Sequence, residues 1–170
     1  MSLMNPEALV VLPNVRGLSL TRPWPWAFVN GPFPKRVENR TWRPAASLIS
    51  THYIALHAAQ SWDEHDRDVI ELITGIVVPP KDQHLHSAIF AVCRITDVVE
   101  EDGTATLEPS QERWFFGPFG WIVGDFVKLI APVACKGAQG LWGFENKQTE
   151  LAELRRVYAA SLASQKGIGV

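Results

Sequence analysis

Short β-type segments separated by turn residues constrain the fold of this 170-residue chain more than any other feature. The most distinct of them spans residues 87–99, which are rich in β-branched side chains and typical of a buried strand. Further strands are expected over residues 18–20, 53–57 (extended on either side), 121–133 (one or two strands bent at Gly124-Asp125) and 140–145. Many short strands with Gly-rich turns and few helices predict an α+β fold built on a small β-barrel.

Three segments predict helices. Pro23–Val29 follows a short strand and ends at an Asn-Gly pair, a common helix stop. A helix from residue 62 to about residue 74 is predicted by a capping box, in which Ser61 and Glu64 satisfy each other's backbone amides. Apolar residues recur at helical spacing over residues 151–162, so an amphipathic C-terminal helix is expected, where it can cover an exposed barrel edge.

Composition limits the classes of function. The formal net charge is −2, which excludes binding to long duplex through many phosphates and leaves only a local patch for nucleic acid. Cys93 and Cys135 are too far apart to suggest a metal site and are expected to be buried free thiols. No apolar run predicts a membrane span and no secretory signal is seen, so a cytoplasmic location is the default expectation.

One polar segment stands out from this background. Lys35, Glu38 and Arg40 lie within six residues, directly after a stretch that contains Trp24 and Trp26. Prolines and a glycine favour a turn, which would place Lys35 and Glu38 on one side of the chain. A cation and a carboxylate beside an aromatic ring suit recognition of a flat polar ligand such as a nucleobase. An ordinary surface ion pair is the alternative interpretation.

A second group of candidate residues lies downstream. His57 ends an apolar strand, where it is either a structural residue or part of a cavity. In the segment from Lys136 to Gly140 the glycines allow a ligand to approach the backbone, and the amide of Gln139 can pair with a base edge. A simple turn between two strands explains this segment equally well.

These motifs together resemble the ASCH domain family, a branch of the PUA-like β-barrels. The family signature Gly-x-Lys-x-x-Glu-x-Arg is kept at Lys35, Glu38 and Arg40, although residues 32–34 lengthen the gap between the Gly and the Lys. The other matching segments are Leu18-Ser19-Leu20, Ala55-Leu56-His57-Ala58, Gly117-Pro118-Phe119-Gly120-Trp121 and Lys136-Gly137-Ala138-Gln139-Gly140-Leu141-Trp142. The resemblance implies a PUA-like domain over residues 16–145 with flanking short helices, an N-terminal arm over residues 1–15 and a helical extension over residues 146–170.

The resemblance also implies a function. The expected ligand is RNA, another single-stranded nucleic acid, or a modified nucleobase or nucleoside, held between the Trp-rich helix, the Lys-x-x-Glu-x-Arg loop and the Lys136–Gly140 turn. No cofactor or metal is expected. The candidate ligand-binding residues are Trp24, Trp26, Lys35, Glu38, Arg40, His57, Lys136 and Gln139.

Two other classes of function remain open. Some ASCH members resemble amidohydrolases of acylated cytidine or ribonucleases; in an enzyme of this kind Glu38 would act as a general base and Lys35 would stabilise an oxyanion, without a metal. The amidohydrolase motif has a Thr nucleophile three residues after the Lys, and this chain has Glu38 there. The third class is a protein-interaction or regulatory domain that docks through the C-terminal helix.

Overall fold

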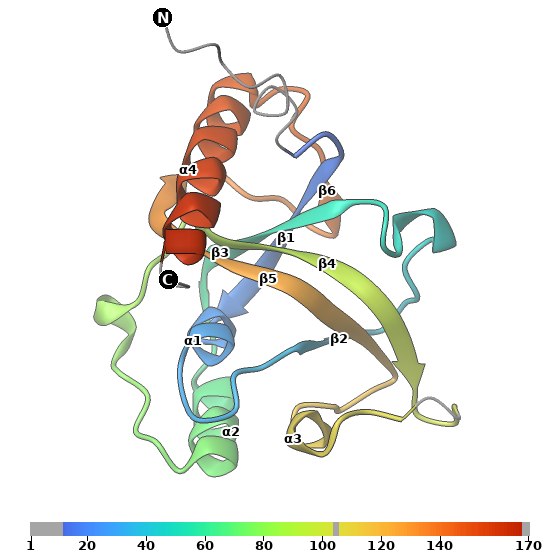
Figure 1. Ribbon diagram of the computed structural model, residues 1–170. Coiled ribbons are helices and arrows are strands. Elements are labelled where there is room, and N and C mark those ends of the chain that lie inside the picture. Colours follow the sequence, from blue (N-terminus) through green and yellow to red (C-terminus); the bar gives the residue numbers. More distant parts are fainter. Residues whose placement is uncertain (1–11, 104–105, 168–170) are drawn as a thin grey trace, which may run out of the picture.

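The computed structural model describes residues 12–103 and 106–167, which form one mixed α+β fold around a six-stranded sheet (Figure 1). The strand order is β2-β5-β4-β3-β1-β6. β1 and β3 are parallel, and every other neighbouring pair is antiparallel. The strands are β1 (Val15–Arg22), β2 (Val37–Arg40), β3 (Tyr53–Trp62), β4 (Ala88–Glu100), β5 (Phe119–Ala134) and β6 (Leu141–Trp142). The α+β class expected from the sequence is confirmed.

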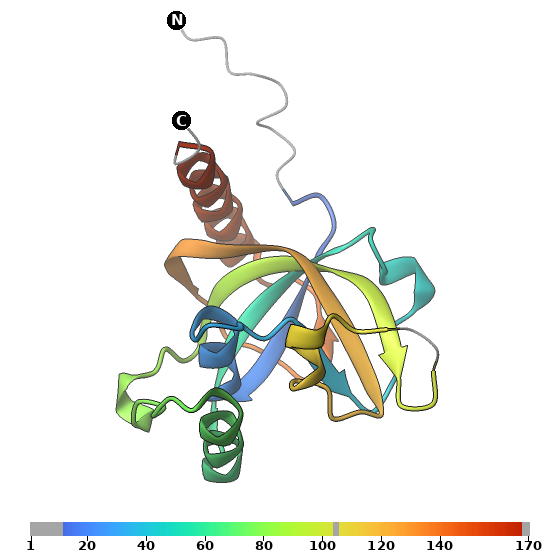
Figure 2. The ribbon, with the colours of Figure 1, turned by 60° about the horizontal axis from the view of Figure 1, so that its bottom comes forward.

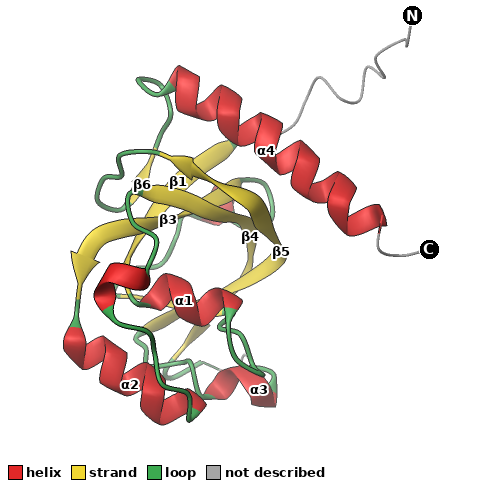
Figure 3. Ribbon diagram, turned by 90° about the vertical axis from the view of Figure 1, so that its left-hand side faces the viewer, coloured by secondary structure: helices red, strands yellow, loops and turns green. Residues whose placement is uncertain are grey.

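The sheet is strongly curved, as Figures 2 and 3 show. β4 and β5 are long, and their pairing shifts register at three places, which bends the ladder as bulges do. Asp125 takes a left-handed φ of 47° in this region, so the bend expected at Gly124-Asp125 lies within one continuous strand. Curvature brings the edge strand β2 close to β1, where Arg40 Nη2 donates to the carbonyl of Ser19 at 3.4 Å. The Arg40 side chain therefore spans the gap between β2 and β1, which do not pair through their backbones.

Four α-helices flank the sheet. α1 (Trp24–Val29), α2 (Glu64–Thr74) and the single-turn α3 (Pro109–Glu112) lie together on one side, and α4 (Gln148–Gly167) lies apart from them (Figure 3). Two short 3₁₀ turns, Ala46–Leu48 and Lys81–Gln83, complete the elements. The inner face of the sheet packs on Phe28 of α1, and a separate cluster joins α1 and α2 to the buried Trp114.

The capping box predicted for α2 is wrong. Ser61 and Trp62 belong to β3, and the N-cap is Asp63, whose carboxylate accepts from the amide of Asp66 at 3.1 Å. Asp is as good an N-cap as Ser, and here strand pairing with β1 reaches Trp62 and takes Ser61 out of capping position.

The C-terminal helix is longer than the expected segment and packs on the sheet. Its apolar side, including the fully buried Leu154, shares a hydrophobic cluster with β5. Ser161 Oγ accepts from the amide of Ile130 at 3.0 Å, so α4 caps part of the β5 edge that β2 does not reach. Burial of this stripe explains why the helical period was readable in the sequence.

The N-terminal arm predicted over residues 1–15 lies mostly outside the described residues. Of its described part, Leu12 is buried in the cluster that α4 forms with the sheet, and Val15 begins β1. The division into arm, domain and extension stays a prediction. Cys93 and Cys135 are both buried free thiols, as expected.

Candidate functional site

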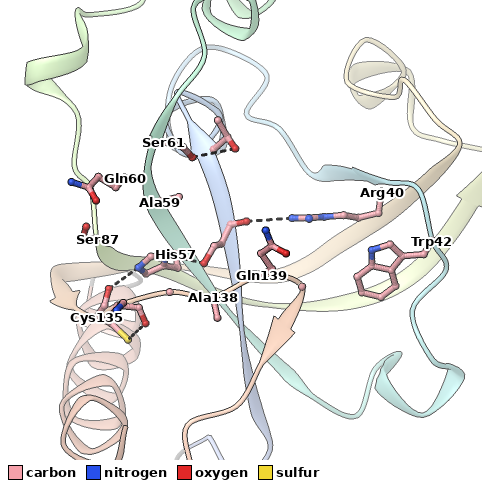
Figure 4. A pocket seen from close by; sticks show the side chains of 15 residues that line it. Arg40, Trp42, His57, Ala59, Gln60, Ser61, Ser87, Cys135, Ala138 and Gln139 are labelled. Atoms are coloured by element: carbon pink, nitrogen blue, oxygen red, sulfur yellow. Dashed lines mark hydrogen bonds between the residues drawn. The ribbon is translucent and has the colours of Figure 1, made fainter. Parts of the chain in front are cut away.

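A pocket of about 860 Å³ lies where the curved sheet leaves its gap, and we call it the main pocket (Figure 4). Its volume is in the range of sites that hold small molecules or single nucleotides. Its walls come from the ends of β1 and β3, from the last residue of β2 and from the loop between β5 and β6. The lining residues are Ser19, Thr21, Arg40, Trp42, His57, Ala59, Gln60, Ser61, Ser87 and Cys135–Gly140.

The lining of the main pocket is polar and basic. Arg40 and Lys136 are its charged members, and no carboxylate is among its lining residues in the described part of the chain. Gln60 and Gln139 add carboxamides, which can both donate and accept hydrogen bonds. Four hydroxyl side chains complete the polar set, from Ser19, Thr21, Ser61 and Ser87. This local excess of positive charge lies on a chain whose net charge is −2.

A chain of hydrogen bonds forms the base of the main pocket. His57 Nε2 lies 2.7 Å from the carbonyl oxygen of Cys135, which can only accept, so Nε2 carries the proton. His57 Nδ1 is then an acceptor for the hydroxyl of Ser19 at 3.0 Å, and the indole of Trp142 donates to the same hydroxyl at 3.1 Å. Burial lowers the pKa of His57, against the opposing effect of the Cys135 hydrogen bond, and favours the neutral ring.

Gly137 lets the loop between β5 and β6 approach this network closely. A β-carbon at Gly137 would overlap the Ser19 hydroxyl and would lie 2.6 Å from the His57 ring. Only glycine therefore lets the loop backbone lie directly against the Ser19–His57 pair. The tight turn predicted for residues 136–140 is a loop that covers one end of β1 and β3.

Arg40 and Trp42 form the opposite end of the main pocket in Figure 4, with Gln139 between them and His57. Both pack on the buried Trp121: the centroids of the Trp42 and Trp121 rings are 4.7 Å apart with the rings nearly perpendicular, and the Arg40 guanidinium lies 6.0 Å from the Trp121 centroid. Arg40 Nη2 pairs with Glu38 Oε1 at 3.1 Å. Among the described residues Arg40 Nε has no hydrogen-bond partner, and the Trp42 side chain is 38% exposed. The Trp42 side chain is thus partly accessible at this end, whereas Arg40 Nε is buried.

Lys35 does not line any of the pockets described in this section. Its side chain is 2% exposed, its Nζ lies 2.9 Å from Glu38 Oε2, and it also donates to the Val37 carbonyl. The ammonium group lies 4.7 Å from the centroid of Phe28 and 5.4 Å from that of Trp24. Burial lowers the pKa of Lys35, and Glu38 opposes the shift. The structure brings Lys35, Glu38 and Arg40 together as one chain of charges, of which only Arg40 reaches the main pocket.

Trp24 and Glu38 face a smaller cavity of about 180 Å³, the carboxylate pocket, which shares Ser19, Thr21 and Arg40 with the main pocket. Asp66 of α2 also lines it and accepts from the Trp24 indole at 2.8 Å. Burial raises the pKa of Asp66, although this hydrogen bond opposes the shift.

Trp26 lies elsewhere. It lines an apolar pocket of about 230 Å³ with Phe90 and Leu85, which shares no residue with the main pocket. Successive residues of a helix point in different directions, so two Trp that are two positions apart in α1 face different cavities.

Comparison with known proteins finds no matching family model and no matching curated protein. Among solved structures, the chain is similar to the crystal structure of a mutant of the ZmASCH protein from Zymomonas mobilis. The sequences are 14% identical, the match covers 83% of this chain and 98% of that one, and the TM-score is 0.46. The name of that protein includes ASCH, the designation of the family whose motifs this sequence resembles. At this level of identity the similarity concerns the fold alone.

Two further observations concern metals and membranes. Within residues 12–103 and 106–167, no group of three or more His, Cys, Asp or Glu side chains could hold a metal ion. Nor does any helix in these ranges have the length and apolarity to cross a membrane.

Several residues of the main pocket were not among the sequence candidates, notably Ser19, Trp42 and Gln60. Trp42 follows Arg40 by two residues, so the strand period that places Arg40 in the pocket would have placed Trp42 on the same side. Ser19 is the polar residue between two leucines in β1, which was a weak signal. Gln60 had no signal, because its position depends on how far β3 extends.

Proposed function

We propose that the protein binds single-stranded nucleic acid, with one nucleotide held in the main pocket. The observation that carries this proposal is the lining of that pocket, which among the described residues has two cations, two carboxamides, four hydroxyls and one partly exposed indole but no carboxylate. Such a set complements an anionic ligand that also has a flat ring with donors and acceptors at its edge. Nucleotides combine these properties.

The base fits the end of the pocket that contains Trp42. Stacking of a base on an aromatic side chain is worth about 1–3 kcal/mol. The Trp42 ring packs nearly perpendicular to the buried Trp121 ring, so it is oriented before a ligand arrives. In this arrangement Gln139 supplies the hydrogen bonds to the base edge.

The phosphate fits the two cations. Arg40 is oriented by Glu38, and its partly exposed side chain lines the pocket. Lys136 is exposed on the covering loop and adds a flexible charge. Lys35 and Glu38 contribute indirectly in this proposal, because Lys35 balances Glu38 and Glu38 positions Arg40. Trp24 and Asp66 support the neighbouring carboxylate pocket.

Binding measurements test the proposal. We expect the purified protein to bind a fluorescein-labelled single-stranded RNA or DNA of mixed sequence in anisotropy titrations. Trp42→Ala should weaken binding about tenfold through lost stacking, and Lys136→Glu should weaken it by a similar factor. Lys166→Glu is the matched control, since Lys166 is an exposed lysine on α4 that is not among the main-pocket residues. Absence of binding by the wild type to all strands and mononucleotides would overturn the proposal.

One observation favours a second candidate function, hydrolysis of an acylated nucleoside or nucleic acid. A serine hydroxyl that donates to a neutral His resembles a nucleophile with its general base, and Ser19 and His57 have this geometry at the base of the main pocket. In such a reaction Ser19 Oγ would attack the acyl carbon while its proton passes to His57 Nδ1, which gives the proton to the leaving group as the bond to the acyl carbon breaks. Water, deprotonated by His57 Nδ1, would then attack the acyl-Ser19 ester, release the acid and return the proton to Ser19 Oγ. Incubation with an aryl fluorophosphonate followed by intact-mass measurement tests this function. An adduct on wild type that Ser19→Ala lacks would support it, whereas an unmodified protein would exclude a reactive Ser19.

A further inference from the structure

We infer that a strand bound in the main pocket continues into a second pocket beside it, which takes the neighbouring nucleotide. This inference rests on the proposed function. The second pocket, of about 710 Å³, is called the histidine pocket. It is lined by Arg22, Gln60, Glu64, Arg67, Pro80, Lys81, Asp82, His84 and His86.

The two pockets are adjacent. Gln60 lines both pockets. The consecutive residues His86 and Ser87 also lie at the boundary, since His86 lines the histidine pocket and Ser87 lines the main pocket. In Figure 4, Gln60 and Ser87 lie at the end of the main pocket opposite Arg40 and Trp42. Ser87 has a left-handed φ of 53°, which is strained for a residue other than glycine, and hydrogen bonds to Ala58 and Cys135 hold it there. A strand that leaves the main pocket at this end enters the histidine pocket.

Arg22 gives the histidine pocket an unbalanced positive charge. Its side chain is 3% exposed and donates to the backbone carbonyls of Gln60, His84 and Lys81, at 2.6, 3.3 and 3.4 Å. Within the described residues it has no carboxylate partner, and its Nε has no hydrogen-bond partner. Arg22 also lies 5.9 Å from the centroid of the Trp62 ring, and a buried cation that is compensated by carbonyl dipoles and an aromatic ring attracts an anion. The phosphate between two successive nucleotides is such an anion.

The charged side chains that line the two pockets also favour an anionic ligand. Together the two pockets include five of the 16 Lys and Arg residues of the chain but only two of its 18 Asp and Glu residues. One of those two, Glu64, is paired with Arg67 at 3.6 Å. Lys81 is exposed and has no ion-pair partner among the described residues, so its side chain can reach a phosphate. The histidine pocket, with three cations and two carboxylates among its lining residues, therefore adds one net positive charge to the two of the main pocket.

The test compares strand lengths in one assay. Binding of a ribonucleoside monophosphate and of a pentanucleotide, as RNA and as DNA, is measured by calorimetry for wild type, Lys81→Glu, Asp82→Lys and the control Lys166→Glu. All three positions are exposed, and circular dichroism checks that each variant is folded. We expect the pentanucleotide to bind at least tenfold tighter than the monophosphate, beyond the about fivefold statistical gain from five bases.

The variants locate the path of the strand. Lys81→Glu should weaken pentanucleotide binding about fivefold, while monophosphate binding stays unchanged. It should also make the negative slope of log affinity against log salt shallower by about 0.7. Asp82→Lys should strengthen pentanucleotide binding. Equal affinities for both lengths, or identical behaviour of Lys81→Glu and Lys166→Glu, would overturn the inference and leave the proposed function standing. Loss of both ligands in the wild type would instead overturn the proposed function.

Discussion

Lys35 and Glu38 face each other inside the protein, with Nζ and Oε2 2.9 Å apart and the Lys35 side chain almost completely buried. Glu38 holds Arg40 with its other oxygen. The charged motif is thus a relay in which an inner cation supports a carboxylate, and the carboxylate orients an outer cation. This relationship assigns different roles to residues that are only five positions apart.

Removal of the inner cation should therefore affect stability before binding. Lys35→Met leaves Glu38 largely buried with Arg40 as its remaining partner, and we expect the free energy of unfolding to fall by about 3 kcal/mol. Urea denaturation measures this loss, with Lys166→Met as the control for an exposed lysine. Nucleic-acid binding should persist at temperatures where the variant is folded. An unchanged unfolding free energy combined with lost binding would mean that Lys35 contacts the ligand.

Gly137→Ala should damage the loop that covers the main pocket. The added β-carbon overlaps Ser19 and His57, so the loop must move, and we expect a loss of about 1–3 kcal/mol in unfolding free energy. Thermal denaturation followed by circular dichroism provides the measurement. Gly143→Ala is the matched control, because its β-carbon meets only the flexible, exposed carboxylate of Glu145. Equal stability of the two variants would contradict the close approach at Gly137.

The N-cap of α2 can be assigned by two single substitutions. Asp63→Ala should lower the unfolding free energy by about 1 kcal/mol, since the amide of Asp66 loses its acceptor. Ser61→Ala should cost much less, because Ser61 is exposed at the end of β3 and its hydroxyl meets only Thr21, at 3.4 Å. Chemical denaturation of both variants decides the matter. The reverse order of the two effects would restore the capping box.

Stability should decline on mild acidification because of two histidines. Burial lowers the pKa of His57 and of His84 below the ordinary value of 6.5. The unfolded chain therefore binds more protons than the native protein between the native pKa values and 6.5, and the free energy of unfolding falls as the pH drops through this window. Urea denaturation at several pH values between about 5.5 and 7.5 measures the slope.

The double variant His57→Gln/His84→Gln should flatten this pH dependence, whatever its absolute stability. His65→Gln, at an exposed position of α2, is the control and should keep the wild-type slope. A double variant with the wild-type slope would mean that other groups cause the acid sensitivity.

Much of the architecture could be predicted from local patterns. The strand over residues 87–99 and the C-terminal helix were found because burial of one face leaves a period in the sequence. Boundaries were less accurate: the strand expected to extend on either side of residues 53–57 begins at Tyr53 and extends only beyond His57, to Trp62, because pairing with β1 continues there. The strand expected over residues 140–145 is reduced to Leu141–Trp142.

By itself, the sequence determined the α+β class, the buried thiols, and the grouping of Lys35, Glu38 and Arg40, because these depend on composition and on short spacings along the chain. Only the tertiary structure decided which of these charges is inside and which is accessible, since that depends on where Phe28 and Trp24 lie above Lys35. The main pocket is likewise a tertiary product. Ser19, His57 and Trp142 are far apart in the chain, and curvature of the sheet and the absence of a side chain at Gly137 bring them together.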